Sequence, residues 1–238
     1  ALLENGRIEV HDGNGDGTFG NAAVYPTGTR TGAVQLAQAD MDRDGDIDIL
    51  VLFNDGLRMH VNNGSGDFSM TLDIGAGVNG LGQLAIIDFN RDGYPDTVTT
   101  SAAPAELRLR RNLRDGDLAM AFGVPASAVP TSGRMSVGDV NRDGFADLLY
   151  GEQTNLINDD DVFVVMHGDG TTLQRAQELS LSTNRTFTTV FTDLDRDSRP
   201  DVVLGVDDGP TQKTSACACT ANPSWGDGEL FEFELVEK

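Results

Sequence analysis

A nine-residue acidic pattern occurs four times in the chain, at residues 40–48, 88–96, 139–147 and 193–201. Every copy has Asp at positions 1, 5 and 9, Asp or Asn at position 3 and Arg at position 4, and the first three copies have Gly at position 6. Calcium takes six to eight oxygen ligands, mostly carboxylates and carbonyls, and position 7 of such a loop offers its backbone carbonyl. The spacing therefore predicts one Ca²⁺ site in each loop, about four ions in all.

The predicted ligands occupy the same positions in every loop. In chain order they are Asp40, Asp42, Asp44, the carbonyl of Asp46 and Asp48; Asp88, Asn90, Asp92, the carbonyl of Tyr94 and Asp96; Asp139, Asn141, Asp143, the carbonyl of Phe145 and Asp147; and Asp193, Asp195, Asp197, the carbonyl of Arg199 and Asp201. Carboxylates this close repel one another unless a cation neutralises them. The fourth loop has Ser198 in place of Gly, and we expect weaker affinity there because a side chain strains a sharp turn.

These loops differ from an EF-hand, which they resemble at first. An EF-hand needs a bidentate Glu at position 12 and a helix on each side. Position 12 is occupied by Val51, Thr99, Tyr150 and Leu204, and we expect none of them to chelate through its side chain. The carboxylate at position 9 therefore has to close each site.

Two groups of arginines stand out in this acidic chain. The arginines at position 4 are interpreted as solvent-facing residues that offset the charge of the loops, with a ring of anion-binding groups as the alternative; they are Arg43, Arg91, Arg142 and Arg196. A second group is interpreted as a solvated strand edge, with contact to an acidic sugar as the alternative; it comprises Arg108, Arg110, Arg111 and Arg114.

A second motif with a G-D-G core lies between the acidic loops. Its central residues are Asp16, Ser65, Asp115, Asp169 and Asp227, at intervals of 49, 50, 54 and 58 residues. The acidic loops begin at intervals of 48, 51 and 54 residues. Two independent motifs thus keep one period near 50, which establishes an internal repeat. We interpret the G-D-G copies as hairpin turns because the loop that begins at Asp12 has Gly20 where the closing carboxylate would be.

The segments around each acidic loop have the patterns of short strands. A small or apolar segment precedes the loop, as in "AVQLAQA", and a compact apolar run such as "IDILVLF" follows it. An alternating stretch such as "GLRMH" comes next, then the G-D-G turn and a fourth strand such as "FSMTLDI". Four strands in about 50 residues are typical of a β-propeller blade. The fold class predicted from the sequence is therefore an all-β propeller of four-stranded blades.

The two motifs together resemble the FG-GAP/VCBS repeats, which form the propeller of integrin α-subunits and many secreted bacterial and fungal propellers. The resemblance covers essentially the whole chain. It implies one propeller domain over residues 1–238, with one Ca²⁺ between the first two strands of each blade. We expect a half blade at 1–30 and full blades at 31–80, 81–130, 131–184 and 185–238. About four and a half blades fall short of the seven or eight usual in such propellers, so we expect further blades from a parent chain or another subunit.

Composition narrows the possible partners and functions. The net charge of −21 would repel nucleic acids and anionic membranes, and no apolar run is long enough to insert into a bilayer. Cys217 and Cys219, spaced C-x-C, form neither a zinc signature nor a disulfide framework, and two buried thiols are favoured over a bridge between them. His11 and His60 occupy one repeat position, which favours a structural role over a catalytic pair.

These observations favour a secreted or cell-surface, or else periplasmic, calcium-binding module that binds a glycan or an extracellular protein. Adhesion and carbohydrate binding are the expected roles, and a non-enzymatic function is favoured. The alternatives are the propeller domain of a polysaccharide-active enzyme, such as a lyase, and a structural component of an extracellular assembly.

Overall fold

All regular secondary structure in the described residues is β-strand. The computed structural model describes residues 2–4, 6–28, 30, 32–74, 79–114, 116–126, 129–130, 135–155, 160–180, 185–197, 199–207 and 230–234. Cys217, Cys219, Ser198 and the turn around Asp227 lie outside these ranges. Within them every regular element is a strand, which confirms the predicted all-β class. Among the same residues there is no helix that could cross a bilayer.

The described strands form five sheets, each built from consecutive parts of the chain. The first contains β1 (Leu2–Glu4), β2 (Arg7–Gly13) and β3 (Phe19–Pro26), and the second contains β4 (Ala33–Ala39), β5 (Asp48–Phe53), β6 (Gly56–Val61) and β7 (Met70–Ile74). The third contains β8 (Asn79–Ile87), β9 (Asp96–Ala103), β10 (Ala105–Asn112) and β11 (Leu118–Pro125). The fourth contains β12 (Val129–Pro130), β13 (Ser136–Gly138), β14 (Asp147–Asn155), β15 (Asp160–Gly168) and β16 (Leu173–Ser180), and the fifth contains β17 (Arg185–Thr192), β18 (Asp201–Asp207) and β19 (Leu230–Glu234).

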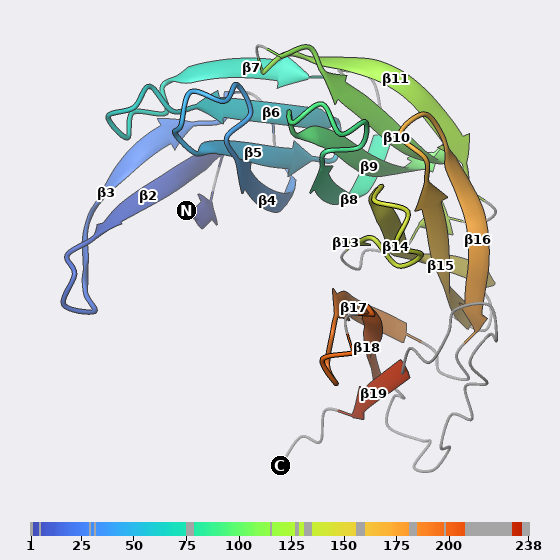
Figure 1. The fold of residues 1–238 in the computed structure, drawn as a ribbon. Helices are drawn as coiled ribbons and strands as arrows, with labels where there is room; N and C mark the ends of the chain where they lie inside the picture. Colours follow the sequence, from blue (N-terminus) through green and yellow to red (C-terminus); the bar gives the residue numbers. More distant parts are fainter. Residues whose placement is uncertain are drawn as a thin grey trace.

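The sheets follow one another along an open arc, which runs from the blue N-terminal sheet to the orange and red C-terminal one (Figure 1). The second and third sheets are four-stranded and antiparallel, with their strands in sequence order. The first strands β4, β8, β13 and β17 lie toward the inside of the arc, and β7, β11 and β16 lie along its outside (Figure 1). The described residues do not form a closed ring.

The structure differs from the sequence expectation at three strands. The first sheet has a third strand, because β1 pairs with β2. The short strand β12 pairs with β14, beside the pairing of β13 with the same strand. The segment Leu230–Glu234, expected as the outermost strand of the last blade, pairs in parallel with β18. The sequence patterns identified only the last of these segments as a strand, and even there they carried no information on its neighbour, which depends on long-range packing.

Neighbouring sheets pack face to face through the strand that follows each acidic loop. In β5, Leu50 and Leu52 are buried in a cluster with Leu84 of β8. Val51 and Phe53, on the opposite face of β5, are buried against Ile8 of β2. The same arrangement joins the third sheet to the fourth and the fourth to the fifth. Burial of each such side chain stabilises by about 1.5–3 kcal/mol, and these strands hold the loops at their ends in place.

Candidate metal sites

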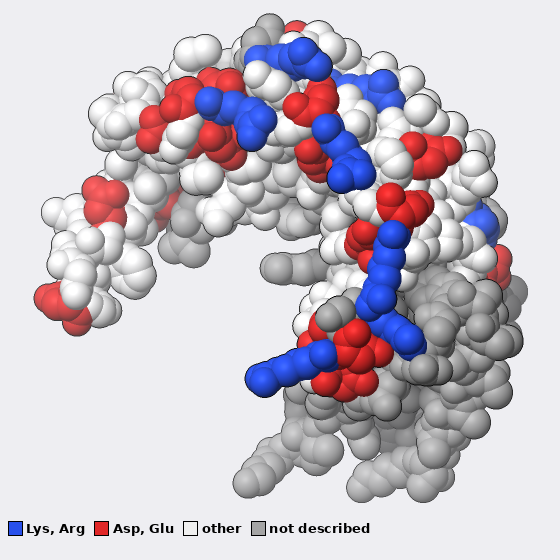
Figure 2. Space-filling view, viewed as in Figure 1, with Lys and Arg blue, Asp and Glu red and all other residues white. Residues whose placement is uncertain are grey.

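Each acidic loop connects the first strand of a sheet to the second. The loops follow β4, β8, β13 and β17 and lead into β5, β9, β14 and β18. They lie on one face of the arc, where acidic clusters alternate with arginine side chains (Figure 2). The four predicted sites therefore occupy equivalent places in four successive sheets.

One hydrogen-bond pattern shapes the loops. The carboxylate at position 1 accepts from the N–H of the Gly at position 6, as between Asp40 Oδ2 and Gly45 at 3.1 Å. The same bond is 2.9 Å long in the second and third loops. Position 3 accepts from the N–H of position 5 in all four loops. Position 5 accepts from the N–H of position 7, also in all four. These bonds turn the side-chain oxygens toward the inside of each loop.

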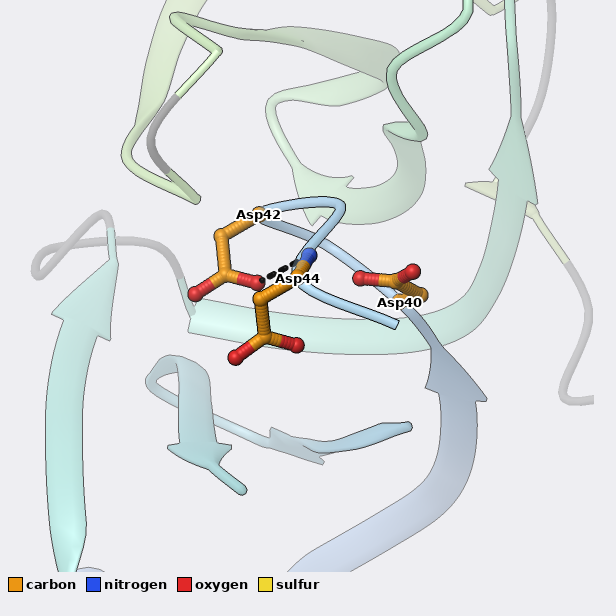
Figure 3. Close-up of side chains that lie close together, drawn as sticks. All are labelled: Asp40, Asp42 and Asp44. Atoms are coloured by element: carbon orange, nitrogen blue, oxygen red, sulfur yellow. Dashed lines mark hydrogen bonds between the residues drawn. The ribbon is translucent and has the colours of Figure 1, made fainter. Parts of the chain in front are cut away.

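The first and fourth loops bring three carboxylates together. Ligand oxygens of Asp40, Asp42 and Asp44 lie within 4.8 Å of one another, and those of Asp193, Asp195 and Asp197 do the same. Figure 3 shows the first group around a single turn of the chain, with the hydrogen bond from Asp44 N to Asp42. The second and third loops have Asn at position 3, and in the third the side-chain amide of Asn141 donates to Asp143.

Two position-1 carboxylates carry a buried oxygen without a hydrogen-bond partner. They are the Oδ1 atoms of Asp40 and Asp139. A buried carboxylate oxygen without a donor is costly unless a cation or proton approaches it. The donor set of each loop, made of carboxylates, amide oxygens and a carbonyl, is the set that Ca²⁺ prefers. The residues present thus fit a calcium ion.

The position-9 aspartates are buried and bonded to the backbone. Asp48, Asp96, Asp147 and Asp201 are at most 2% exposed. In each, Oδ2 accepts from the N–H of position 2 at 2.8–3.1 Å. In the first three, Oδ1 accepts from an N–H at or just beyond the end of the third strand, at 2.8–3.0 Å. These carboxylates join three parts of one sheet, a role that the sequence pattern did not reveal.

Burial raises the pKa of Asp48, Asp96 and Asp147 above the usual value of an aspartate, although backbone hydrogen bonds act in the opposite direction. In the first two, other carboxylates of the same loop raise the pKa further. The ionised form of these carboxylates is therefore disfavoured, and a cation bound beside them would offset that cost.

The position-4 arginines are exposed, as expected, but two of them also bridge neighbouring loops. The guanidinium of Arg43 lies 5.4 Å from the ring centre of Tyr94, at position 7 of the next loop. Arg91 lies at the same distance from the ring of Phe145, one loop further on. All four arginines have positive φ, between 57° and 66°. We call Arg43, Tyr94, Arg91 and Phe145 the arginine–aromatic row. The sequence analysis missed it because its contacts connect different repeats.

The arginine–aromatic row also limits the space for a side chain at position 6 of the loop. Gly93 has a φ of 87°, and a Cβ there would lie 2.4 Å from Arg43 Nη1. Gly45 has a φ of 98°, and nothing lies within 4 Å of its Cβ position. Both glycines adopt the left-handed backbone conformation, but of the two only Gly93 has a neighbour, Arg43, that an added side chain would displace.

This difference predicts unequal effects for the same substitution. Gly45→Ala should cost about 1–2 kcal/mol from the backbone conformation alone. Gly93→Ala should cost about 0.5–1 kcal/mol more, because it displaces Arg43 from Tyr94. Urea denaturation of the two variants, each also made in an Arg43→Ala background, measures this difference. In that background the extra cost should disappear, and an unchanged difference would contradict a role for Arg43.

The arginines of β10 and the histidines His11 and His60 are held by contacts within the fold, which favours structural roles for them. Arg108, Arg110 and Arg111 were expected at a solvated strand edge but lie on β10, which pairs with both β9 and β11, so that expectation was wrong. Arg110 is 3% exposed and donates to the hydroxyl of Thr99. His60 Nδ1 lies 3.1 Å from the carbonyl of Phe68, and His11 Nδ1 lies 3.0 Å from that of Gly20. Each histidine thus contacts a backbone carbonyl near the start of the next strand, although Gly20 lies one repeat position beyond the equivalent of Phe68.

The G-D-G turns use their aspartates locally. Asp16 Oδ1 accepts from both the N–H and the hydroxyl of Thr18. Asp169 makes the corresponding bonds with Thr171 and also accepts from Thr172. These carboxylates shape hairpin turns between β2 and β3 and between β15 and β16, as the sequence predicted.

Comparison with known proteins gives one family match. Residues 1–51, 40–99 and 88–150 match the model of an FG-GAP-like repeat, and the second and third matches begin at the first residue of an acidic loop. No curated protein matches the chain significantly. Among solved structures, the crystal structure of the Vibrio cholerae biofilm matrix protein Bap1 aligns with a TM-score of 0.42 and 17% identity. The alignment covers 74% of this chain but only 27% of Bap1, and a similarity at this level carries no argument about function.

Proposed function

The chain belongs to the FG-GAP-like repeat family, and we propose that it is a calcium-binding β-propeller module that mediates binding outside the cytoplasm. The observation that carries this proposal is the common geometry of the four loops. Positions 3 and 5 accept the same backbone hydrogen bonds in all four loops, and position 1 accepts its bond in the first three. The buried Oδ1 atoms of Asp40 and Asp139 lack a donor. Ca²⁺ would supply the missing charge.

In this proposal each ion binds to the oxygens at positions 1, 3 and 5 and to the carbonyl at position 7. The carboxylate at position 9 is the last ligand of each ion. An oxygen that accepts one backbone N–H keeps a second lone pair with which it can bind the ion. About four ions are then bound, one per loop. The fourth site is the weakest, because its carboxylates are the most exposed and Ser198 replaces the Gly.

The propeller arrangement is supported by the order of the sheets. Strands run outward from the inner strand of each sheet, and each sheet packs on the next along the arc (Figure 1). Further blades, either from a longer parent chain or from another subunit, would complete a ring. The four blades at 31–80, 81–130, 131–184 and 185–238 and the half blade at 1–30 form one domain in this view.

A glycan or an extracellular protein is the proposed partner. The strongly acidic surface disfavours nucleic acids and anionic membranes. Calcium sites of moderate affinity are useful where free calcium is high, as it is outside the cell. A role in adhesion follows from this setting together with the family.

The proposal is tested by binding assays at two calcium levels. The full chain, first in calcium and then in chelator, is applied to a glycan array and to immobilised extracellular matrix proteins. We expect binding to at least one class in calcium and at least a tenfold loss in chelator. Equal binding in both buffers would contradict the calcium-dependent role. Breakdown of an acidic polysaccharide into unsaturated ends during the incubation would instead support an enzyme.

A further inference from the structure

Arg110 is a buried cation inside the third sheet. It is 3% exposed, and its strand β10 pairs with β9 on one side and with β11 on the other. Arginine is almost never fully buried unless it is paired with an acid. Its Nη1 donates to the hydroxyl of Thr99 at 3.0 Å, and no carboxylate of the described residues forms an ion pair with it. A neutral hydroxyl leaves the positive charge of the guanidinium uncompensated.

The side chain of Arg110 points toward the second sheet. Its partner across β9 is Thr97. Thr97 and Thr99 are in turn paired with Ile86 and Leu84 of β8. Directly paired residues carry their side chains on one face of a sheet, and Leu84 and Ile86 pack against apolar side chains of the second sheet. This cluster contains no charged residue, so it offers nothing that could offset the charge of Arg110.

The polar neighbours on the same strand do not neutralise this charge either. Arg108, two residues away on the same face, is a second cation and is already paired with Glu106. On the side of the loop, the side-chain oxygen of Asn112 accepts from two backbone N–H groups. Burial, and after it the charge of Arg108, lowers the pKa of Arg110 below the usual value of an arginine. The surroundings of Arg110 therefore disfavour the charge that it carries.

Strand β9 supplies hydroxyl donors on the same face. Thr97, directly across from Arg110, is fully buried, and its hydroxyl has no hydrogen-bond partner. Thr99 is also fully buried, and because its hydroxyl oxygen accepts from Arg110, its hydrogen is left for another acceptor. A buried donor without a partner is costly. One guanidinium and two hydroxyls thus offer hydrogen-bond donors on one face without a negatively charged acceptor.

From this arrangement we propose that a small monovalent anion of the size of chloride binds beside Arg110 and accepts hydrogen bonds from the hydroxyls of Thr97 and Thr99. A buried charge is tolerated when an opposite charge and hydrogen bonds replace its lost hydration. The anion supplies the missing opposite charge and the missing acceptor together. A doubly charged anion such as sulfate does not fit, because its second charge would be buried without a partner.

The first test compares the stability of the full chain in different sodium salts. Urea denaturation is measured in chloride, in formate and in isethionate, which is too large for the site, at equal ionic strength and at one calcium concentration. At a tenfold excess of the anion over its dissociation constant, the unfolding equilibrium constant should be about elevenfold lower than in isethionate. The formate samples show whether a small carboxylate replaces chloride. Equal stability in all three salts would overturn the proposal.

Arginine variants connect the chloride effect to Arg110. Arg110→Met should fold, because an apolar residue of similar volume often replaces a buried charge without loss of stability, and its stability should be the same in chloride and isethionate. Arg111→Met is the matched control. It removes the same charge from the next residue, whose side chain donates to the carbonyl of Gly170 in the fourth sheet, and it should keep the full chloride effect. A chloride effect that persists in Arg110→Met would contradict the proposal.

Hydroxyl variants test the donors on β9. Thr97→Val should weaken the chloride effect severalfold, because it removes a hydroxyl directly across from Arg110. Ser101→Ala is its control, since Ser101 is also fully buried with a hydroxyl that has no partner, but it is paired with Glu106. This variant should respond to chloride like the wild type. Equal responses of the two variants would exclude Thr97 as a ligand of the anion.

Bromide gives a direct view of the same site, because its anomalous scattering locates it in a crystal. Crystals grown in bromide should show an anomalous peak beside Arg110, and crystals of Arg110→Met should lack it. A wild-type crystal without this peak would count against the proposal. Arg110 is not among the proposed calcium ligands, so Arg110→Met should still be stabilised by calcium. Failure of the anion site therefore leaves the proposed calcium sites unaffected.

Discussion

Removing calcium is expected to lower the melting temperature of the protein by a large amount. A ligand present at a hundredfold excess over its dissociation constant stabilises a fold by about 2.7 kcal/mol per site. For a chain of this size, loss of one such site corresponds to roughly 5–10 °C, and several sites should lose their ions together. Thermal unfolding is followed by circular dichroism in buffer with excess Ca²⁺ and in buffer with a chelator.

Two matched substitutions test whether the calcium effect on the melting temperature comes from the acidic loops. Asp42→Asn weakens the first site, so calcium should raise the melting temperature less than in the wild type. Asp12→Asn removes the same charge from an exposed position on β2, outside the acidic loops, and should leave the calcium effect unchanged. Mg²⁺ should replace Ca²⁺ poorly, since it demands a smaller octahedral site. A melting temperature that chelation does not move would refute the metal assignment.

The second large effect is expected from the position-9 aspartates, and it should appear without any metal. Asp96→Ala removes the acceptor of two backbone N–H groups, those of Phe89 and Asn112. A buried donor left without a partner costs about 1–3 kcal/mol, so this variant should lose about 3 kcal/mol or more. Asp92→Ala in the same loop should cost only about 1 kcal/mol, because its carboxylate accepts from a single loop N–H and otherwise pairs with the exposed Arg114.

Urea denaturation in chelator measures both variants. Calcium is then added to each, and the stabilisation that it provides is compared. We expect both variants to lose calcium stabilisation, because both remove a proposed ligand, but only Asp96→Ala to be severely destabilised in chelator. Equal stabilities of the two variants in chelator would show that the backbone bonds of Asp96 contribute little.

The sequence predicted the local parts of this structure well. The alternation in "GLRMH" and the apolar run in "IDILVLF" identified β6 and β5, and the acidic spacing located the loop between β4 and β5. These predictions succeeded because a strand or a tight loop is encoded by residues close together in the chain. The ligand roles assigned to the loop residues remain predictions.

Contacts between different repeats could not be predicted from these sequence patterns. The position of Arg43 over Tyr94 depends on how two sheets pack, and nothing in the nine-residue pattern indicates it. Arg110 is buried although its neighbours in sequence are basic, because β10 lies inside a stack of sheets. The bonds that Asp48 accepts from the backbone of Met41 and Asn62 combine the acidic loop with the segment that follows β6. In each case tertiary packing, not local preference, determines the role.

The arginine–aromatic row has a consequence for how such a chain can be rearranged. Each contact has a donor repeat, which supplies the arginine, and an acceptor repeat, which supplies the ring and a glycine beside it. The last repeat has Arg199 at the ring position and Ser198 at the glycine position, so it lacks the features of an acceptor. Repeats of this chain are therefore not interchangeable. Duplicating the second or third repeat within the row preserves every contact, whereas moving the fourth one upstream breaks the row at that point.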